Sequence, residues 1–231
     1  MKNKILSMKK KRLDTDISII LSITGVVFLL YIFFQGNITA YLKNTDYNLL
    51  IRTIMASALQ FGIAGLGICI VIIFRKENFH GYGIKINNMF RAILLSIIPI
   101  LPYILLKTIN GEMSGYLPFK YVLHTREWIE LGLPGNVVGF CIIGIVWGFF
   151  EPFNYVVICK KINERWSYPN LFLSLGPLLC GIFSLLIHGL FTINLENLFI
   201  FFIIYGMLVV SEKTKNAWGC ILIFIFLWNA I

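Results

Sequence analysis

Two ionisable side chains lie inside long apolar stretches of the sequence, and they are the first candidates for chemistry. Of the 11 acidic residues, Glu151 is the one placed well within an apolar run. Of the three histidines, only His188 lies inside such a run, since His80 and His124 fall in predicted loops. An ionisable group inside a membrane span is costly and is by default a functional candidate. A carboxylate beside a neutral imidazole can serve as a general base paired with a stabiliser of an oxyanion.

The neighbours of Glu151 strengthen this interpretation. The apolar segments that carry Glu151 and His188 are consecutive and joined by a short loop, so we expect antiparallel helices that bring the two side chains together. Asn154 and Tyr155, at i+3 and i+4 from Glu151, share its helix face. Pro152 loosens the helix beside the acid, because proline cannot donate the helical hydrogen bond. Taken singly, the acid can pin two helices together and the histidine can lie at the membrane interface.

The rest of the chain predicts how these side chains are held. Hydrophobic residues make up 58% of the 231 residues and charged residues 13%, whereas a soluble domain is about half apolar and about a quarter charged. About 20 residues of apolar helix match the ~30 Å hydrocarbon layer of a bilayer, and a helix satisfies its own backbone groups there. The sequence therefore predicts an all-α, polytopic transmembrane helix bundle of about seven spans. These are Ile17–Phe34, Thr53–Phe74, Ala92–Leu106, Pro134–Cys159, Leu171–Phe191, Leu195–Val210 and Ala217–Ile231.

The distribution of charge predicts the orientation and three regions. The formal net charge is +9, but the cations flank apolar runs, which is typical of an orientation signal rather than of nucleic-acid binding. With the N-terminus in the cytoplasm, the inner segments hold most of the 20 lysines and arginines, as the positive-inside rule requires. We expect a basic cytoplasmic segment (1–16), two spans with a basic inner loop (17–91) and a helical membrane core (92–231). The prediction is a multi-pass protein of the plasma membrane without a nucleic-acid partner.

No cofactor is predicted. The five cysteines lie in or at the edge of apolar runs, and none has CxxC spacing, so neither a disulfide framework nor a zinc site is indicated. One glutamate and one histidine also fall short of the three protein ligands of a catalytic zinc ion, which argues against metal dependence.

The sequence resembles the CPBP family in three features. These are a Glu inside an apolar run, a basic turn about ten residues later, and a His toward the end of the next apolar run. This family contains type II CAAX prenyl endopeptidases and bacteriocin-immunity (abortive-infection) proteins. The resemblance covers about residues 92–231 and involves the motifs EExxxR, FxxxH, and HxxxN or HxxxD. Glu151 matches the first Glu, His188 the His of the second motif, and Asn229 the final Asn. The chain departs from the motifs with Pro152 for the second Glu, Val156 for the Arg, Ser184 for the Phe and Ile225 for the last His.

The resemblance implies an intramembrane endopeptidase that hydrolyses peptide bonds of membrane-anchored peptides, prenylated ones among them. Glu151 would activate the attacking water as general base, His188 would be its electrostatic partner, and Asn229 would help to stabilise the oxyanion. Asn154 and Tyr155 would support these groups. The implied partners are membrane lipid and a membrane-anchored peptide or protein substrate.

Two other functions stay open at this point. The departures from the motifs are those expected of a catalytically degenerate relative that acts as an immunity or regulatory membrane protein through helix contacts. Gly144 and Gly148 would then permit close approach of a partner helix. A small proton-coupled transporter would instead use Glu151 and His188 as a proton relay. The sequence shows no internal repeat of the kind that many transporters carry.

Overall fold

The computed structural model describes the whole chain apart from residues 1, 114, 168–169, 171–173, 190–194 and 231. Every regular element in the described part is a helix, so the predicted all-α class is confirmed. The elements are α1 (Lys2–Lys43), α2 (Leu49–Ala64), α3 (Leu66–Arg75), η1 (Phe79–Tyr82), α4 (Met89–Ile97), η2 (Ile98–Ile100), α5 (Leu101–Ile109), α6 (Thr125–Glu130), α7 (Gly135–Ile143), η3 (Gly144–Phe150), α8 (Glu151–Arg165), α9 (Leu175–Gly189), α10 (Leu195–Thr214), α11 (Trp218–Ile223) and η5 (Phe224–Trp228). The segments η1 and η2 are 3₁₀ turns, whereas η3 and η5 are π-helical.

By the criteria of length and apolarity, the described chain has fewer candidate membrane spans than the seven that the sequence predicted. Four helical stretches of the described chain are long and apolar enough to cross a membrane: Leu6–Lys43, Met89–Ile109, Gly135–Arg165 and Leu195–Thr214. The helices α2 and α3 are bent by 57° at their junction and count as a fifth only if taken together. The apolar helices Leu175–His188 and Trp218–Trp228 are shorter. The helical bundle is therefore confirmed, and the count of seven is not.

The first helix extends beyond the predicted span Ile17–Phe34 on both sides. Residues 2–16 of the predicted basic segment belong to α1, which runs unbroken over 42 residues. At 1.5 Å per residue this helix is about 63 Å long, roughly twice the hydrocarbon layer. The ends of the predicted spans 171–191 and 217–231 fall partly on residues outside the described ones.

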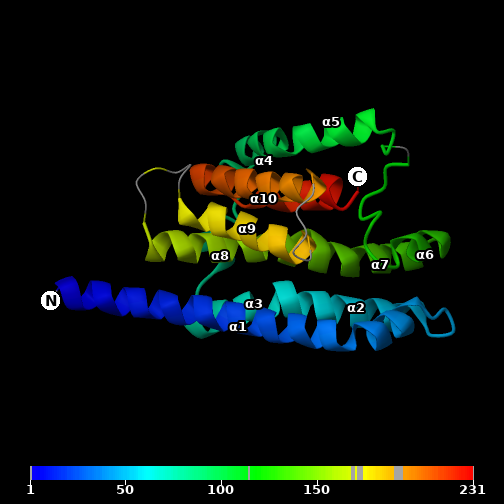
Figure 1. Cartoon of the computed structure of the whole chain (residues 1–231), viewed down its shortest axis with the longest axis horizontal. Helices are drawn as coiled ribbons and strands as arrows, with labels where there is room; N and C mark the ends of the chain where they lie inside the picture. Colours follow the sequence, from blue (N-terminus) through cyan, green and yellow to red (C-terminus); the bar gives the residue numbers. More distant parts are fainter. Residues whose placement is uncertain (1, 114, 168–169, 171–173, 190–194, 231) are drawn as a thin grey trace.

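The helices are arranged in three layers (Figure 1). The helices α1, α2 and α3 form one layer, α7, α8 and α9 form the middle layer, and α10 and α11 with α4 and α5 lie on the other side. In the most apolar part of Gly135–Arg165, 61% of the residues are buried, against 11% in the corresponding part of Leu6–Lys43. The α7–η3–α8 run is therefore the central helix of the bundle, and α1 is a peripheral one.

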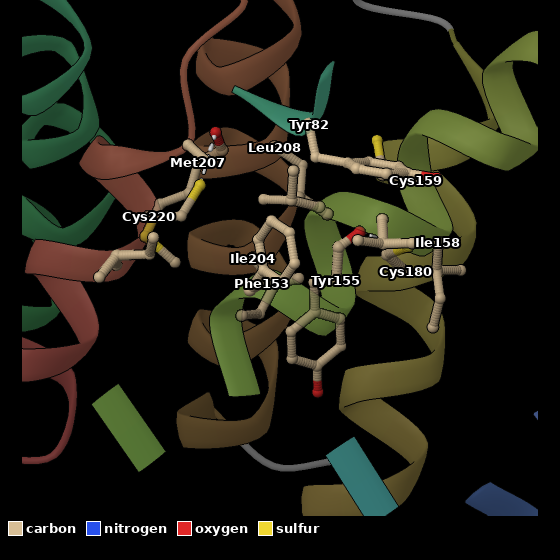
Figure 2. Close-up of a cluster of buried hydrophobic side chains, with 14 of the residues drawn as sticks. Tyr82, Phe153, Tyr155, Ile158, Cys159, Cys180, Ile204, Met207, Leu208 and Cys220 are labelled. Carbon is tan, nitrogen blue, oxygen red and sulfur yellow. Dashed lines mark hydrogen bonds between the residues drawn. The ribbon is translucent and has the colours of Figure 1, made fainter. Parts of the chain in front are cut away.

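The main core lies between α8, α9, α10 and α11, as Figure 2 shows. Phe153 of α8 is fully buried there, and Met207 of α10 and Cys220 of α11 are nearly so. Large apolar side chains also cover the outside of the bundle: Phe33 of α1 is 78% exposed and Phe74 of α3 is 79% exposed. Such apolar surface is unfavourable in water but suits contact with lipid.

A cluster of ion pairs joins α1 and α3 to α8 at the end of the bundle where the N-terminus lies. Asp16 is fully buried. Its carboxylate accepts hydrogen bonds from Nε of Arg75 at 2.6 Å and from Nζ of Lys161 at 2.9 Å. Glu77 pairs with the same lysine at 3.1 Å and with Arg12 at 2.7 Å. This basic-end cluster connects segments that are far apart in the sequence.

A second cluster lies at the opposite end of the α1–α3 layer. The buried Arg52, near the start of α2, donates to the backbone carbonyls of Leu42 and Tyr47, both at 3.1 Å. Its guanidinium also pairs with Glu127 of α6 at 2.6 Å, and Nδ1 of His124 lies 2.8 Å from the same carboxylate. This arginine cluster therefore holds the end of α1, the start of α2 and α6 together.

Replacing Lys161 by Met should lower the free energy of unfolding by about 3–5 kcal/mol, because Asp16 would keep a buried charge with one partner removed. The midpoint of thermal unfolding of the detergent-solubilised protein measures this effect. Lys10→Met is the matched control, since Lys10 lies exposed on α1 and should change stability by less than about 0.5 kcal/mol. Equal midpoints for the two variants would show that the basic-end cluster does not stabilise the fold.

Replacing Glu127 by Gln should reduce thermal stability at neutral pH but not in acid. Hydrogen bonds from Arg52 and His124 hold the pKa of Glu127 below its ordinary value of 4.5. Because the pKa of Glu127 is lowered in the folded state, its ionised carboxylate stabilises the fold above pH 4.5. This stabilisation is lost as the pH falls through the lowered pKa. Unfolding midpoints of wild type and variant should therefore converge as the pH is lowered below 4.5. The exposed Glu130, changed to Gln, is the control, and a difference that persists undiminished in acid would contradict the ion-pair explanation.

Candidate functional site

Glu151 lies at the point where the central helix changes its hydrogen-bonding pattern. It is the first residue of α8, it is 6% exposed, and the π-helical segment η3 precedes it directly. Pro152 has no N–H for the carbonyl of Gly148, so one α-helical hydrogen bond is missing here. Single π-helical turns within α-helices are rare and are frequently found at functional sites.

Gln60 of α2 is the hydrogen-bond partner of the buried acid. Its side-chain Nε2 donates to Oε2 of Glu151 at 3.1 Å. The sequence interpretation missed this residue, although one signal was present: Gln60 is a polar amide in the middle of the apolar run Thr53–Phe74. An amide in such a run is unfavourable unless it is hydrogen-bonded.

The first of two cavities beside Glu151 lies between α1 and α2 on one side and α8 and α9 on the other. Its volume is about 290 Å³, and side chains such as Phe28, Leu59 and Ile187 line most of it. We call it the apolar cavity. Its polar lining includes all four residues predicted from the Glu151 and His188 segments, together with the missed glutamine: Gln60, Glu151, Asn154, Tyr155 and His188.

The second cavity, of about 620 Å³, lies between α5, residues 121–123, α10 and η5. We call it the polar cavity, because hydrophilic groups line much of it. Its rim carries Lys107, whose ammonium group donates to Glu112 at 2.6 Å and to Glu196 at 2.9 Å. Glu151 and His188 line this cavity as well, so they lie where the apolar and polar cavities meet.

His188 and Asn229 reach the site in different ways. His188 is exposed toward the cavities, and its ring meets Trp228 edge-on with the centroids 6.2 Å apart. Asn229 lines the polar cavity only, and its side-chain Nδ2 donates to the carbonyl of Phe224 in its own helix at 3.3 Å. Glu151 and His188 share the walls of both cavities without a direct hydrogen bond to each other.

Three positions at which the chain departs from the CPBP motifs lie away from these two cavities. Pro152 lines a small space against α10 and α11 on the far side of α8. Val156 lines a different cavity near the basic end of the bundle. Ile225 packs close to Gly148, where an added methyl group would lie 2.6 Å from its side chain. Gly148 therefore serves contacts within the chain, which weakens the prediction that a partner helix docks there.

Among the described residues, no group of three His, Cys, Asp or Glu side chains lies close enough together to hold a metal ion.

The sequence matches no family model, no curated protein and no solved structure. The CPBP resemblance consequently rests on Glu151, His188 and Asn229 and their spacing, and it stays a prediction.

Proposed function

We propose that the chain is an intramembrane endopeptidase in which Glu151 activates a water molecule. One observation carries this proposal: Glu151 and His188 lie together at the junction of an apolar and a polar cavity. A membrane-anchored peptide has the same two-part character, with an apolar stretch next to polar backbone and side chains. The junction is where a peptide bond at the end of such a stretch would lie.

The residues at this junction supply the groups that the proposed hydrolysis requires. The Glu151 carboxylate takes a proton from a water molecule, and the oxygen of that water attacks the carbonyl carbon of the peptide. His188 and Asn229, which line the polar cavity, are the groups that would donate to the oxyanion as charge develops on it. The proton on Glu151 then passes to the leaving nitrogen, the C–N bond breaks, and the carboxylate is regenerated.

The charges of the bundle support an orientation for this enzyme. The basic-end cluster and the N-terminal lysines would lie at the cytoplasmic side, in agreement with the positive-inside rule. The arginine cluster and the rim of the polar cavity would then lie at the outer side of the plasma membrane. The substrate would be a membrane-anchored peptide whose polar end reaches the outer side.

Replacing Glu151 by Gln should lower the rate of hydrolysis at least about 100-fold, because a proton acceptor typically contributes about 10²–10⁴-fold. His188→Ala should cost about 10²–10³-fold if the imidazole stabilises the oxyanion. Purified protein would be incubated with a panel of lipopeptides and transmembrane peptides, and new chain ends would be quantified by mass spectrometry. Glu130→Gln, which removes an exposed acid of α6 that lines neither cavity, is the matched control.

The Glu151→Gln variant also separates the alternatives when it is tested in further assays. Equal cleavage by wild type and Glu151→Gln would exclude Glu151 as the base. Absence of cleavage together with a cellular phenotype that survives Glu151→Gln would support a regulatory protein. Proton-coupled uptake into proteoliposomes that is lost in Glu151→Gln would support a transporter.

A further inference from the structure

We propose that Gln60 is a positioning residue of the Glu151 site: its side-chain amide holds one carboxylate oxygen of Glu151 and leaves the other oxygen for the attacking water. This inference rests on the proposed hydrolytic function. It assigns a role in the site to α2, which lies outside the 92–231 region of CPBP resemblance. The site would therefore be built between the N-terminal layer and the central helix.

The geometry of the contact supports this role. Nε2 of Gln60 donates to Oε2 of Glu151 at 3.1 Å, and both side chains line the apolar and the polar cavity. An ionised carboxylate only accepts hydrogen bonds, so a donor such as the amide NH₂ is the chemically suitable partner. With Oε2 occupied, Oε1 is the oxygen that can accept the proton of a water molecule in the cavity.

The helix that carries Gln60 is fixed on both sides of this residue. Toward its start, Arg52 is held in the arginine cluster, and Thr53 accepts a hydrogen bond from the indole N–H of Trp128 at 2.9 Å. Toward its end, the carbonyl of Ile63 accepts a hydrogen bond from Thr24 of α1 at 2.8 Å. The amide of Gln60 is thus presented to Glu151 by a helix with little freedom to move, as a positioning group requires.

The bond has a further consequence for the chemistry. A donor to the carboxylate favours its ionised form, which is the form that accepts a proton from water. Hydrogen bonds to charged groups are stronger than those between neutral groups. Loss of the Gln60 amide should therefore reduce the rate of the chemical step more than it affects substrate binding.

Gln60→Met removes the donor at nearly constant side-chain length and tests the proposal. We expect kcat to fall about 10- to 100-fold, the range that corresponds to one hydrogen bond to a charged group. KM should change less than about twofold, because the substrate-lining walls remain. Ser57→Ala is the matched control on the same helix: it removes a buried hydroxyl without a hydrogen-bond partner and should leave both constants unchanged. A normal kcat for Gln60→Met would overturn the proposal.

An infrared measurement tests the contact without any substrate. The carboxyl bands of Glu151 are identified by their loss in Glu151→Gln, and we expect them to shift in Gln60→Met but not in Ser57→Ala. The double exchange Gln60→Glu with Glu151→Gln keeps an acid–amide pair and should fold normally yet lack activity, because the acid then lies on α2. Unshifted bands in Gln60→Met would overturn the positioning role. Shifted bands without peptide cleavage in wild type would confirm the contact and reject the proposed hydrolysis instead.

Discussion

The α1–α3 layer is attached to the rest of the bundle at its two ends by ion pairs that each contain a buried charge, and the site around Glu151 depends on this attachment. Asp16 and Lys161 join the layer to α8 at one end, and Arg52 and Glu127 join it to α6 at the other. Buried charges of this kind are strongly unfavourable when one partner is missing, so they select the arrangement in which both are paired. Between the two attachments, side chains from both layers leave the apolar cavity open.

This arrangement explains how an acid can be kept inside an apolar bundle. Glu151 is almost fully buried, which is unfavourable for a carboxyl group unless a polar partner is present. Gln60 supplies that partner from the opposite layer, and Glu151 also lines the polar cavity. Glu151 directly follows the π-helical segment and lies at the junction of the two cavities. The surroundings of Glu151 therefore depend both on the local helix geometry and on the packing of the layers.

Part of the site could be recognised from the sequence because an ionisable residue in an apolar run stands out. Glu151 and His188 were found in this way, and helical periodicity correctly placed Asn154 and Tyr155 on the same cavity wall. Gln60 was missed because it is uncharged and lies 91 residues from Glu151. The predicted count of seven spans is not confirmed by the criteria of length and apolarity, in part because the helix is bent between α2 and α3, a break that hydropathy does not reveal.

The sequence by itself determined that the chain forms apolar helices and that very few ionisable groups lie within them, because both properties depend on residue type and local spacing. Only the tertiary structure decided which helices meet around Glu151, that Gln60 is its partner, and that Pro152, Val156 and Ile225 lie away from its cavities. Contacts between distant segments depend on how whole helix surfaces pack and on which buried charges find partners. No local pattern in a single sequence contains that information.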